Sequence, residues 1–136
     1  MVQQKKEPLA SAEEHRRCIT RWEEVPDVSL GPGLHMHITT AERMTAIFTN
    51  LEPNSVVPHH KHDPEQIMMV MEGGGEQVVL GKRYKVKAGD YLVVPAGSGH
   101  ALYVGPKGIR TIEVFSPPRH DYETKLAEAM KAKKKK

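Results

Sequence analysis

The sequence predicts one all-β domain, a sandwich or barrel, followed by a short C-terminal helix. From Gly31 onward, short β-branched or alternating runs are separated about every 8 to 12 residues by Pro, Gly or Asn, which is typical of such folds. No internal repeat at a fixed period is present, which argues against solenoids and propellers. A chain of 136 residues, 38% of them hydrophobic, supports one core and not two.

Charge and composition restrict the class of partner. The formal charge of +3 comes from the C-terminus: residues 125–136 hold six lysines and one glutamate, which leaves fourteen basic against sixteen acidic residues elsewhere. We interpret this end as a solvated tail and predict no nucleic-acid partner. The sequence shows neither a secretory signal nor an apolar run of about 20 residues, so we expect a cytoplasmic protein without membrane contact. The lone Cys18 excludes an internal disulfide and a thiolate zinc site.

The first 30 residues are interpreted as an extension that packs on the barrel or on a partner subunit. Within it, Ser11 and Glu14 form a capping-box pattern that predicts a short helix, whereas Ile19 to Val25, with Trp22, fits a strand equally well. The barrel is assigned to residues 31–119, and its exposed sheet edges, together with the extension, predict a homodimer.

Nine strands are predicted inside the barrel. They cover Leu34 to Ile38, Met44 to Leu51, Ser55 to Val57, Ile67 to Met71, Glu76 to Leu80, Lys82 to Val86, Tyr91 to Val94, His100 to Val104 and Arg110 to Phe115. The glycines 73–75 between the fourth and fifth runs predict a hairpin turn. After Pro117 and Pro118 the last strand ends, and Asp121 is expected to cap a helix with an apolar stripe of Leu126, Ala129 and Met130. We assign residues 120–136 to this helix and the lysine-rich tail.

Two histidines in the segment 58–66 have the spacing of metal ligands. On a strand, residues two apart point to the same face about 6.6 Å apart, so His60 and His62 can converge on one ion while their neighbours point away. Gln66 lies on the same face by this alternation and is a candidate for a further ligand. Because Pro64 disturbs the alternation after Asp63, Glu65 stays open as the alternative ligand.

A second segment, 89–100, ends a buried strand in a Pro and Gly turn that delivers His100. The two segments together resemble the two signature motifs of the cupin superfamily. The matching residues are His60, His62 and Gly73 in the first motif and Gly89, Pro95, Gly97 and His100 in the second. Three positions depart from the pattern: Asn54 replaces a glycine, Val104 replaces an asparagine, and Gln66 replaces the usual glutamate ligand. The resemblance implies a double-stranded β-helix, or jelly roll, that holds one divalent metal.

The resemblance therefore assigns the metal ligands to His60, His62, Gln66 and His100. Three neutral imidazoles and an amide would leave the charge of the ion uncompensated and make it a strong Lewis acid. A six-coordinate ion would keep two open positions for substrate or water. The spacing does not choose among nickel, iron, manganese and zinc.

The closing segment 113–119 resembles that of the pectin-degradation cupins, which convert ring-closed unsaturated uronates into linear keto sugar acids. The resemblance implies that Glu113 transfers a proton, that Phe115 contributes an aromatic wall and that Arg119 binds the substrate carboxylate. From the residues alone, Glu113 and Phe115 share one strand face that points either into the barrel or outward. Arg119 either binds a carboxylate or fastens the tail to the rim. Met68 has the parity of Gln66 and is expected to line the same pocket.

Two further histidines, His35 and His37, have ligand spacing but lie opposite the apolar face of their strand. We expect both to face solvent or a partner subunit and do not assign them to the metal.

The sequence favours a metal-dependent lyase or isomerase that acts on a small carboxylated sugar or keto acid. In this reading the substrate is a small anion, and the metal polarises one of its oxygens while Glu113 moves a proton. Two alternatives stay open: an Fe(II)-dependent dioxygenase, and a non-catalytic cupin that binds a small molecule through the same metal.

Overall fold

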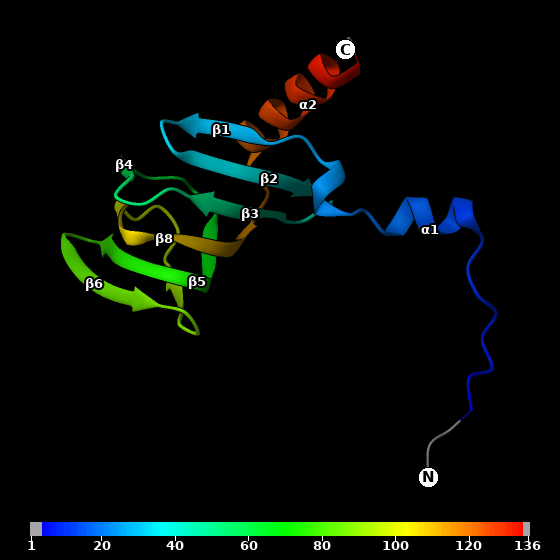
Figure 1. The fold of residues 1–136 in the computed structure, drawn as a ribbon, viewed down its shortest axis with the longest axis horizontal. Helices are drawn as coiled ribbons and strands as arrows, with labels where there is room; N and C mark the ends of the chain where they lie inside the picture. The colour runs from blue at the N-terminus through cyan, green and yellow to red at the C-terminus, as the bar shows by residue number, and fades with distance from the viewer. Residues whose placement is uncertain (1–3, 135–136) are drawn as a thin grey trace.

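The computed structural model describes residues 4–134; residues 1–3 of the extension and 135–136 of the lysine tail lie outside the described part. Two α-helices, one 3₁₀ helix and eight strands follow one another (Figure 1). They are α1 (Ala12–Cys18), η1 (Trp22–Glu24), β1 (Val28–Gly31), β2 (Leu34–Thr40), β3 (Thr45–Leu51), β4 (Val56–His60), β5 (Glu65–Val79), β6 (Lys82–Lys87), β7 (Tyr91–Val94), β8 (His100–Ser116) and α2 (His120–Lys134).

All strand pairs are antiparallel, and the two longest strands build the barrel by belonging to both of its halves. Strand β8 pairs with β4 through its first residues and with β3 through its last, and it pairs with β5 along most of its length. Strand β5 likewise pairs first with β7 and then with β6. The prediction of an all-β double-sheet barrel with a C-terminal helix is confirmed.

The predicted hairpin turn at glycines 73–75 is wrong, because β5 runs through all three residues. The strand bends here between the two halves of the barrel, and its register against β8 shifts between Val70 and Gly75. A Cβ at Gly73 would collide with the carbonyl oxygen of Gly108, and one at Gly75 with that of Tyr103. These glycines therefore allow two bent strands to approach each other closely.

The N-terminal segment contains the predicted helix but not the alternative strand. The Ser11 side chain accepts from the backbone of Glu14, and the Glu14 carboxylate accepts from the backbone of Ser11, so the capping box forms. Trp22 begins a 3₁₀ turn instead of a strand. The sheet itself begins at Val28, three residues before the predicted start of the barrel, because β1 pairs with β2.

Two apolar clusters fill the barrel. One contains Leu34, Leu51, Met68, Val70, Leu102, Val104 and Ile109, and the other Val28, Met36, Ile38, Ile47, Phe115 and Tyr122. Helix α2 covers the second cluster through Leu126 and Ala129, as predicted, whereas Met130, the third residue of the predicted stripe, is 41% exposed. The helix begins at His120, so Asp121 lies in its first turn and is not its N-cap. Within the described residues, neither α-helix is long and apolar enough to cross a membrane.

Two departures from the cupin motifs fit the barrel. Asn54 takes a φ of 62°, the left-handed region that glycine favours and that Asn tolerates better than most other residues. Val104 is buried in the first apolar cluster, where a polar asparagine would need hydrogen-bond partners.

Candidate metal centre

Three histidines from two neighbouring strands and one loop meet inside the barrel. Strand β4 ends at His60, which is paired with His100 at the start of β8, and His62 follows two residues later. One ring nitrogen from each lies within 4.8 Å of those of the other two. His100 is 3% exposed, and the other two are half-buried. This cluster is able to hold a metal ion.

The three imidazole rings are held by the same kind of hydrogen bond. In each, Nδ1 lies 2.8 to 2.9 Å from a backbone carbonyl oxygen two residues away, to which it donates as the N–H tautomer. The accepting carbonyls belong to Pro58, Pro64 and Ser98. This bond fixes the ring and leaves the lone pair of Nε2 free for a ligand, the usual arrangement of metal-binding histidines. Among the described residues, Nε2 of His100 is buried and has no hydrogen-bond partner.

Burial favours the neutral imidazoles that bind metal. Burial is the main cause that lowers the pKa of His100 from 6.5 to about 4; His60, His62 and Arg119 contribute to the same shift, and the hydrogen bond to the Ser98 carbonyl opposes it. The pKa of His62 is lowered for the same main reason, with an added contribution from Arg119. Neutral rings at neutral pH are ready to accept a cation without first losing a proton.

Gln66, not Glu65, points into the site. Gln66 is 4% exposed, and its Oε1 lies 3.1 Å from Nε2 of His62. Because Nδ1 of His62 carries the ring proton, the two facing atoms are both acceptors, and a cation between them would satisfy both. Glu65 is exposed on the opposite face of β5.

A buried polar chain lies behind Gln66. The side-chain amide nitrogen of Gln66 donates to Oε1 of Glu113, and the hydroxyl of Thr111 donates to Oε2 of the same carboxylate at 2.6 Å. Thr111 in turn shares a hydrogen bond with Thr49. Burial raises the pKa of Glu113, while the hydrogen bond from Thr111 and the charge of Arg119 oppose the rise. Glu113 therefore points into the barrel, a direction that strand alternation alone could not decide. Its hydrogen bond holds the amide group of Gln66 in place.

Arg119 occupies the rim, with a side chain that is only 8% exposed. Its Nε and Nη2 donate to the carboxylate of Asp121 at 3.0 and 2.7 Å. The guanidinium also lies over the rings of Phe115 and Tyr122, with its carbon 4.9 and 3.9 Å from their centroids. Nη1 is buried and has no partner within the described residues. Arg119 therefore fastens the start of α2 and still offers one free donor.

All of the predicted site residues except His62 line one cavity of about 50 Å³. Its lining includes His60, Gln66, Met68, His100, Glu113, Phe115 and Arg119. This space fits an ion with a water molecule, since a water occupies about 30 Å³. A larger hollow of about 360 Å³ lies over the rim and is lined by both His62 and Arg119.

Sequence reasoning missed three polar residues of this cavity, Thr49, Gln77 and Tyr122. Gln77 is 2% exposed, and its buried Oε1 lacks a partner in the described chain. The bend of β5 at the glycines changes the strand register, so alternation counted from Gln66 could not show that Gln77 points inward. Tyr122 also lines the cavity from α2, and burial raises its pKa to about 12. In the sequence, the only sign that Tyr122 is buried was its position as an aromatic residue among polar residues, close to Arg119.

His35 and His37 do not join the metal cluster. Both lie half-buried on the outer face of β2. His35 contacts the carboxylates of Asp27 and Glu52 at 3.3 and 3.2 Å, and Nδ1 of His37 lies 3.0 Å from the carbonyl oxygen of Val25.

Comparison with known proteins agrees with this geometry. The cupin domain family matches residues 47–115. The chain belongs to the cupin family. A cupin described as RmlC-like, from Shewanella frigidimarina, superimposes with a TM-score of 0.72 at 25% identity, over 77% of this chain and 95% of the other. KdgF from a Halomonas species has the same fold, with a TM-score of 0.68 at 24% identity over 74% and 93% of the two chains.

A curated relative of this cupin is an enzyme. The dimethylsulfoniopropionate lyase DddW of Ruegeria pomeroyi is 29% identical over 58 residues, which is 43% of this chain and 38% of the lyase. The match therefore spans well under half of the relative's length.

Proposed function

We propose that this cupin is a metal-dependent lyase or isomerase that acts on a small carboxylated substrate, such as an unsaturated uronate or a related keto acid. The observation that carries the proposal is a cavity that holds two histidines of the three-histidine cluster, a buried carboxyl group and the Arg119 donor that has no partner among the described residues. A metal ion at the histidines would polarise an oxygen of the substrate, and Gln66 would complete its protein ligands.

Arg119 binds the substrate carboxylate in this proposal. Its Nη1 is the free donor, and its other nitrogens stay on Asp121, which holds the guanidinium in place. The hollow over the rim has room for a small anion and also contains Lys61 and His120. The cavity below has room for little more than the ion, so the substrate binds in the hollow with its reacting end turned inward.

Glu113 moves the proton. Its raised pKa suits a group that is protonated and deprotonated in turn. In an elimination, the Glu113 carboxylate removes a proton from a carbon next to the polarised group. The electrons of that C–H bond form the new double bond, and the leaving group departs with its own bonding pair. In an isomerisation, Glu113 returns the same proton to a different atom. Neither route changes the oxidation state of the metal.

The relative supports the elimination route. That relative is a lyase, and dimethylsulfoniopropionate is a small carboxylate. The match covers 58 residues, so it supports the reaction class without giving this cupin the same substrate.

The test is an anaerobic assay of the metal-loaded protein against unsaturated uronates, keto sugar acids and β-substituted propionates. We expect turnover without oxygen. Glu113→Gln should slow it by roughly 100-fold or more, the usual size of a general acid-base effect, and Arg119→Ala should mainly raise KM. The matched control is Glu65→Gln, because Glu65 is exposed on the outside of the same strand; it should leave the rate unchanged.

Two outcomes would replace the proposal. Strict dependence on dioxygen with ferrous iron would make the protein a dioxygenase. Tight binding of a small anion without turnover of any compound in the panel would make it a non-catalytic binding protein.

A further inference from the structure

Three buried side-chain atoms have no hydrogen-bond partner among the described residues: Oε1 of Gln77, Nε2 of His100 and Nη1 of Arg119. All three residues line the cavity of the metal centre. Buried polar atoms are paired in nearly all native structures, because an unpaired one has lost its water without gaining a partner. The three atoms therefore indicate which groups a ligand of this cavity has to supply.

The proposed function accounts for two of these atoms. In it, the metal ion binds Nε2 of His100, and the substrate carboxylate accepts a hydrogen bond from Nη1 of Arg119. A carboxylate cannot pair with Oε1 of Gln77, because both groups are acceptors. The amide oxygen of Gln77 therefore needs a further group that donates an O–H or N–H.

Gln77 lies one cross-strand row away from the histidines. His100 pairs with His60 on one side and with Val79 of β5 on the other. Gln77 lies two residues before Val79, directly opposite Leu102. Residues in such diagonal positions, here Gln77 and His100, are about 7 to 8 Å apart, which long side chains can span. One ligand group in the cavity can therefore contact both the metal ion and the amide of Gln77.

The protein part of the surroundings of Gln77 is apolar. Leu102 belongs to the first apolar cluster, and Val57, the next residue in the same row, packs against that cluster. A methionine of similar volume would fill the place of Gln77 without leaving a polar atom unpaired. Packing alone therefore does not explain a glutamine here, and its role lies in the cavity.

We propose that Gln77 accepts a hydrogen bond from a hydroxyl group of the substrate, and that it thereby selects hydroxy acids over carboxylates that lack this hydroxyl. The assignment rests on the proposed function, which places the substrate carboxylate at Arg119. The cavity of about 50 Å³ fits the ion and one group the size of a water. A substrate hydroxyl takes the place of that water and keeps its hydrogen bond.

The substrate class becomes narrower as a result. The substrate carries a carboxylate at the rim and a hydroxyl at the end that is turned inward. Sugar acids have both groups, whereas a β-substituted propionate without a hydroxyl leaves Oε1 of Gln77 unpaired. A site built to pair with a hydroxyl rejects the analogue that lacks it, because its own buried polar group then stays unpaired.

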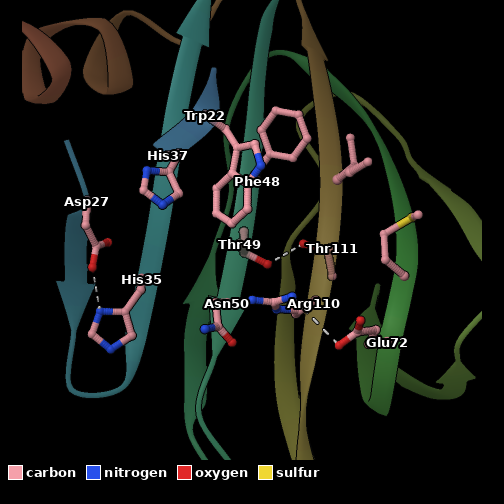
Figure 2. A pocket seen from close by; sticks show the side chains of 12 residues that line it. Trp22, Asp27, His35, His37, Phe48, Thr49, Asn50, Glu72, Arg110 and Thr111 are labelled. Carbon is pink, nitrogen blue, oxygen red and sulfur yellow. Dashed lines mark hydrogen bonds and ion pairs between the residues drawn. The ribbon is translucent and has the colours of Figure 1, made fainter. Parts of the chain in front are cut away.

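A larger cleft of about 490 Å³ lies on the outer face of the sheet and does not show the same need for a ligand. Figure 2 shows Trp22 over Phe48 at one end of this cleft and the Arg110 guanidinium facing the Glu72 carboxylate at the other, with 3.9 Å between their charged atoms. None of the three unpartnered atoms found in residues 4–134 belongs to its lining. The unmet hydrogen bonds of this part of the chain are gathered in the cavity of the metal centre.

The first experiment measures binding and needs no turnover. Isothermal titration calorimetry of the metal-loaded protein compares hexanoate with its monohydroxy derivatives, which carry one hydroxyl at each chain position in turn. The derivative whose hydroxyl reaches Gln77 should bind roughly 10-fold or more tightly than hexanoate, because it pairs the buried amide oxygen. Equal affinity for hexanoate and all its derivatives would overturn the assignment.

The second experiment repeats the titrations with Gln77→Met, which keeps the volume of the side chain and removes the acceptor. The preference for the hydroxy acid should disappear, while the affinity for hexanoate and the stoichiometric metal content stay unchanged. The matched control is Leu102→Met, directly opposite Gln77 in the register; it should keep the preference. Without ligand, the midpoint of urea denaturation of Gln77→Met should equal or exceed that of the unmodified chain, because an unpaired buried atom has been removed.

Three results with the variant would also overturn the assignment. A hydroxyl preference that Gln77→Met retains would come from the ion and not from Gln77. Loss of metal would make Gln77 a ligand of the ion, and a clearly lower urea midpoint would make it a structural residue. Failure of every acid to bind would instead refute the carboxylate site of the proposed function, whereas binding without turnover would refute its chemistry and leave the role of Gln77 intact.

Discussion

Strands β3, β5 and β8 bury several polar side chains between the apolar core residues of their inner face, and part of their outer face is apolar. Inside the barrel, Thr111 and Glu113 are buried, whereas Ile112 and Val114 between them are partly open to water outside. Strand β5 repeats the inversion with a buried Gln66 and an exposed Ile67. An ordinary half-buried strand turns its apolar side chains inward. At these positions the inversion places Gln66 and Glu113 along the cavity inside the barrel.

Hydrogen bonds between neighbouring side chains allow the polar groups of the inner face to stay buried. Each interior group is paired with the next, from Thr49 through Thr111 and Glu113 to Gln66. The buried side-chain atoms that lack partners among residues 4–134, on Gln77, His100 and Arg119, belong to residues that line the cavity of the proposed metal and substrate. Unsatisfied buried atoms are costly unless something binds them.

The largest expected effect comes from removing the interior ligands. The double variant His60→Ala/His62→Ala should lose stoichiometric divalent metal, because two of the three imidazoles of the cluster are gone. Elemental analysis of the purified protein measures this. His59→Ala, an exposed neighbour, is the control and should keep its metal. Full retention in the double variant would refute the assignment of the site.

A smaller effect, on the free energy of unfolding, is expected when one hydrogen bond of the buried polar side chains is removed. Thr111→Val keeps the shape of the side chain but removes the donor to Oε2 of Glu113. An unpaired buried acceptor costs about 1 to 3 kcal/mol in the free energy of unfolding, measured by urea denaturation. Thr39→Val, at an exposed position facing outward, should change it by less than about 0.5 kcal/mol. Equal effects at both positions would remove the distinction between the two faces.

The last expected effect concerns the pH dependence of stability in the metal-free protein. The pKa of His100 is about 4 in the fold, against the ordinary value of 6.5. As pH falls, the unfolded chain therefore binds a proton at this residue before the folded one does. The stability contributed by neutral His100 is complete above pH 6.5 and is lost as pH falls from 6.5 towards 4.

After removal of metal with a chelator, the free energy of unfolding of His100→Gln should therefore fall less steeply over this pH range than that of the unmodified chain. Denaturation in urea at a series of pH values measures both slopes. Parallel slopes would show that His100 does not titrate in this way.

The sequence predicted the fold because its signals were local and repeated. Turn residues, alternating runs and the two histidine segments each specified a short piece of chain, and together they predicted the barrel and its C-terminal helix. The exception was the glycine run 73–75. Glycine serves a turn and a close strand approach equally well, and only the distant Gly108 and Tyr103 show that the second applies.

The site could be predicted in part for the same reason. Spacing and family resemblance suggested the three histidines, which the fold brings together. The direction of Glu113 could not be known, since alternation gives parity and not orientation. Gln77 and Tyr122 reach the cavity from a bent strand and from a helix after the barrel, and no local pattern connects them to the histidines.

The central claim is that one metal ion sits inside the barrel between the three histidines and Gln66. Anomalous diffraction at the absorption edge of the bound metal tests it most directly. The predicted result is a single peak about 2.0 to 2.2 Å from Nε2 of His60, His62 and His100 and from Oε1 of Gln66. A peak elsewhere in the molecule, or a metal held by the carboxylate of Glu65, would contradict it.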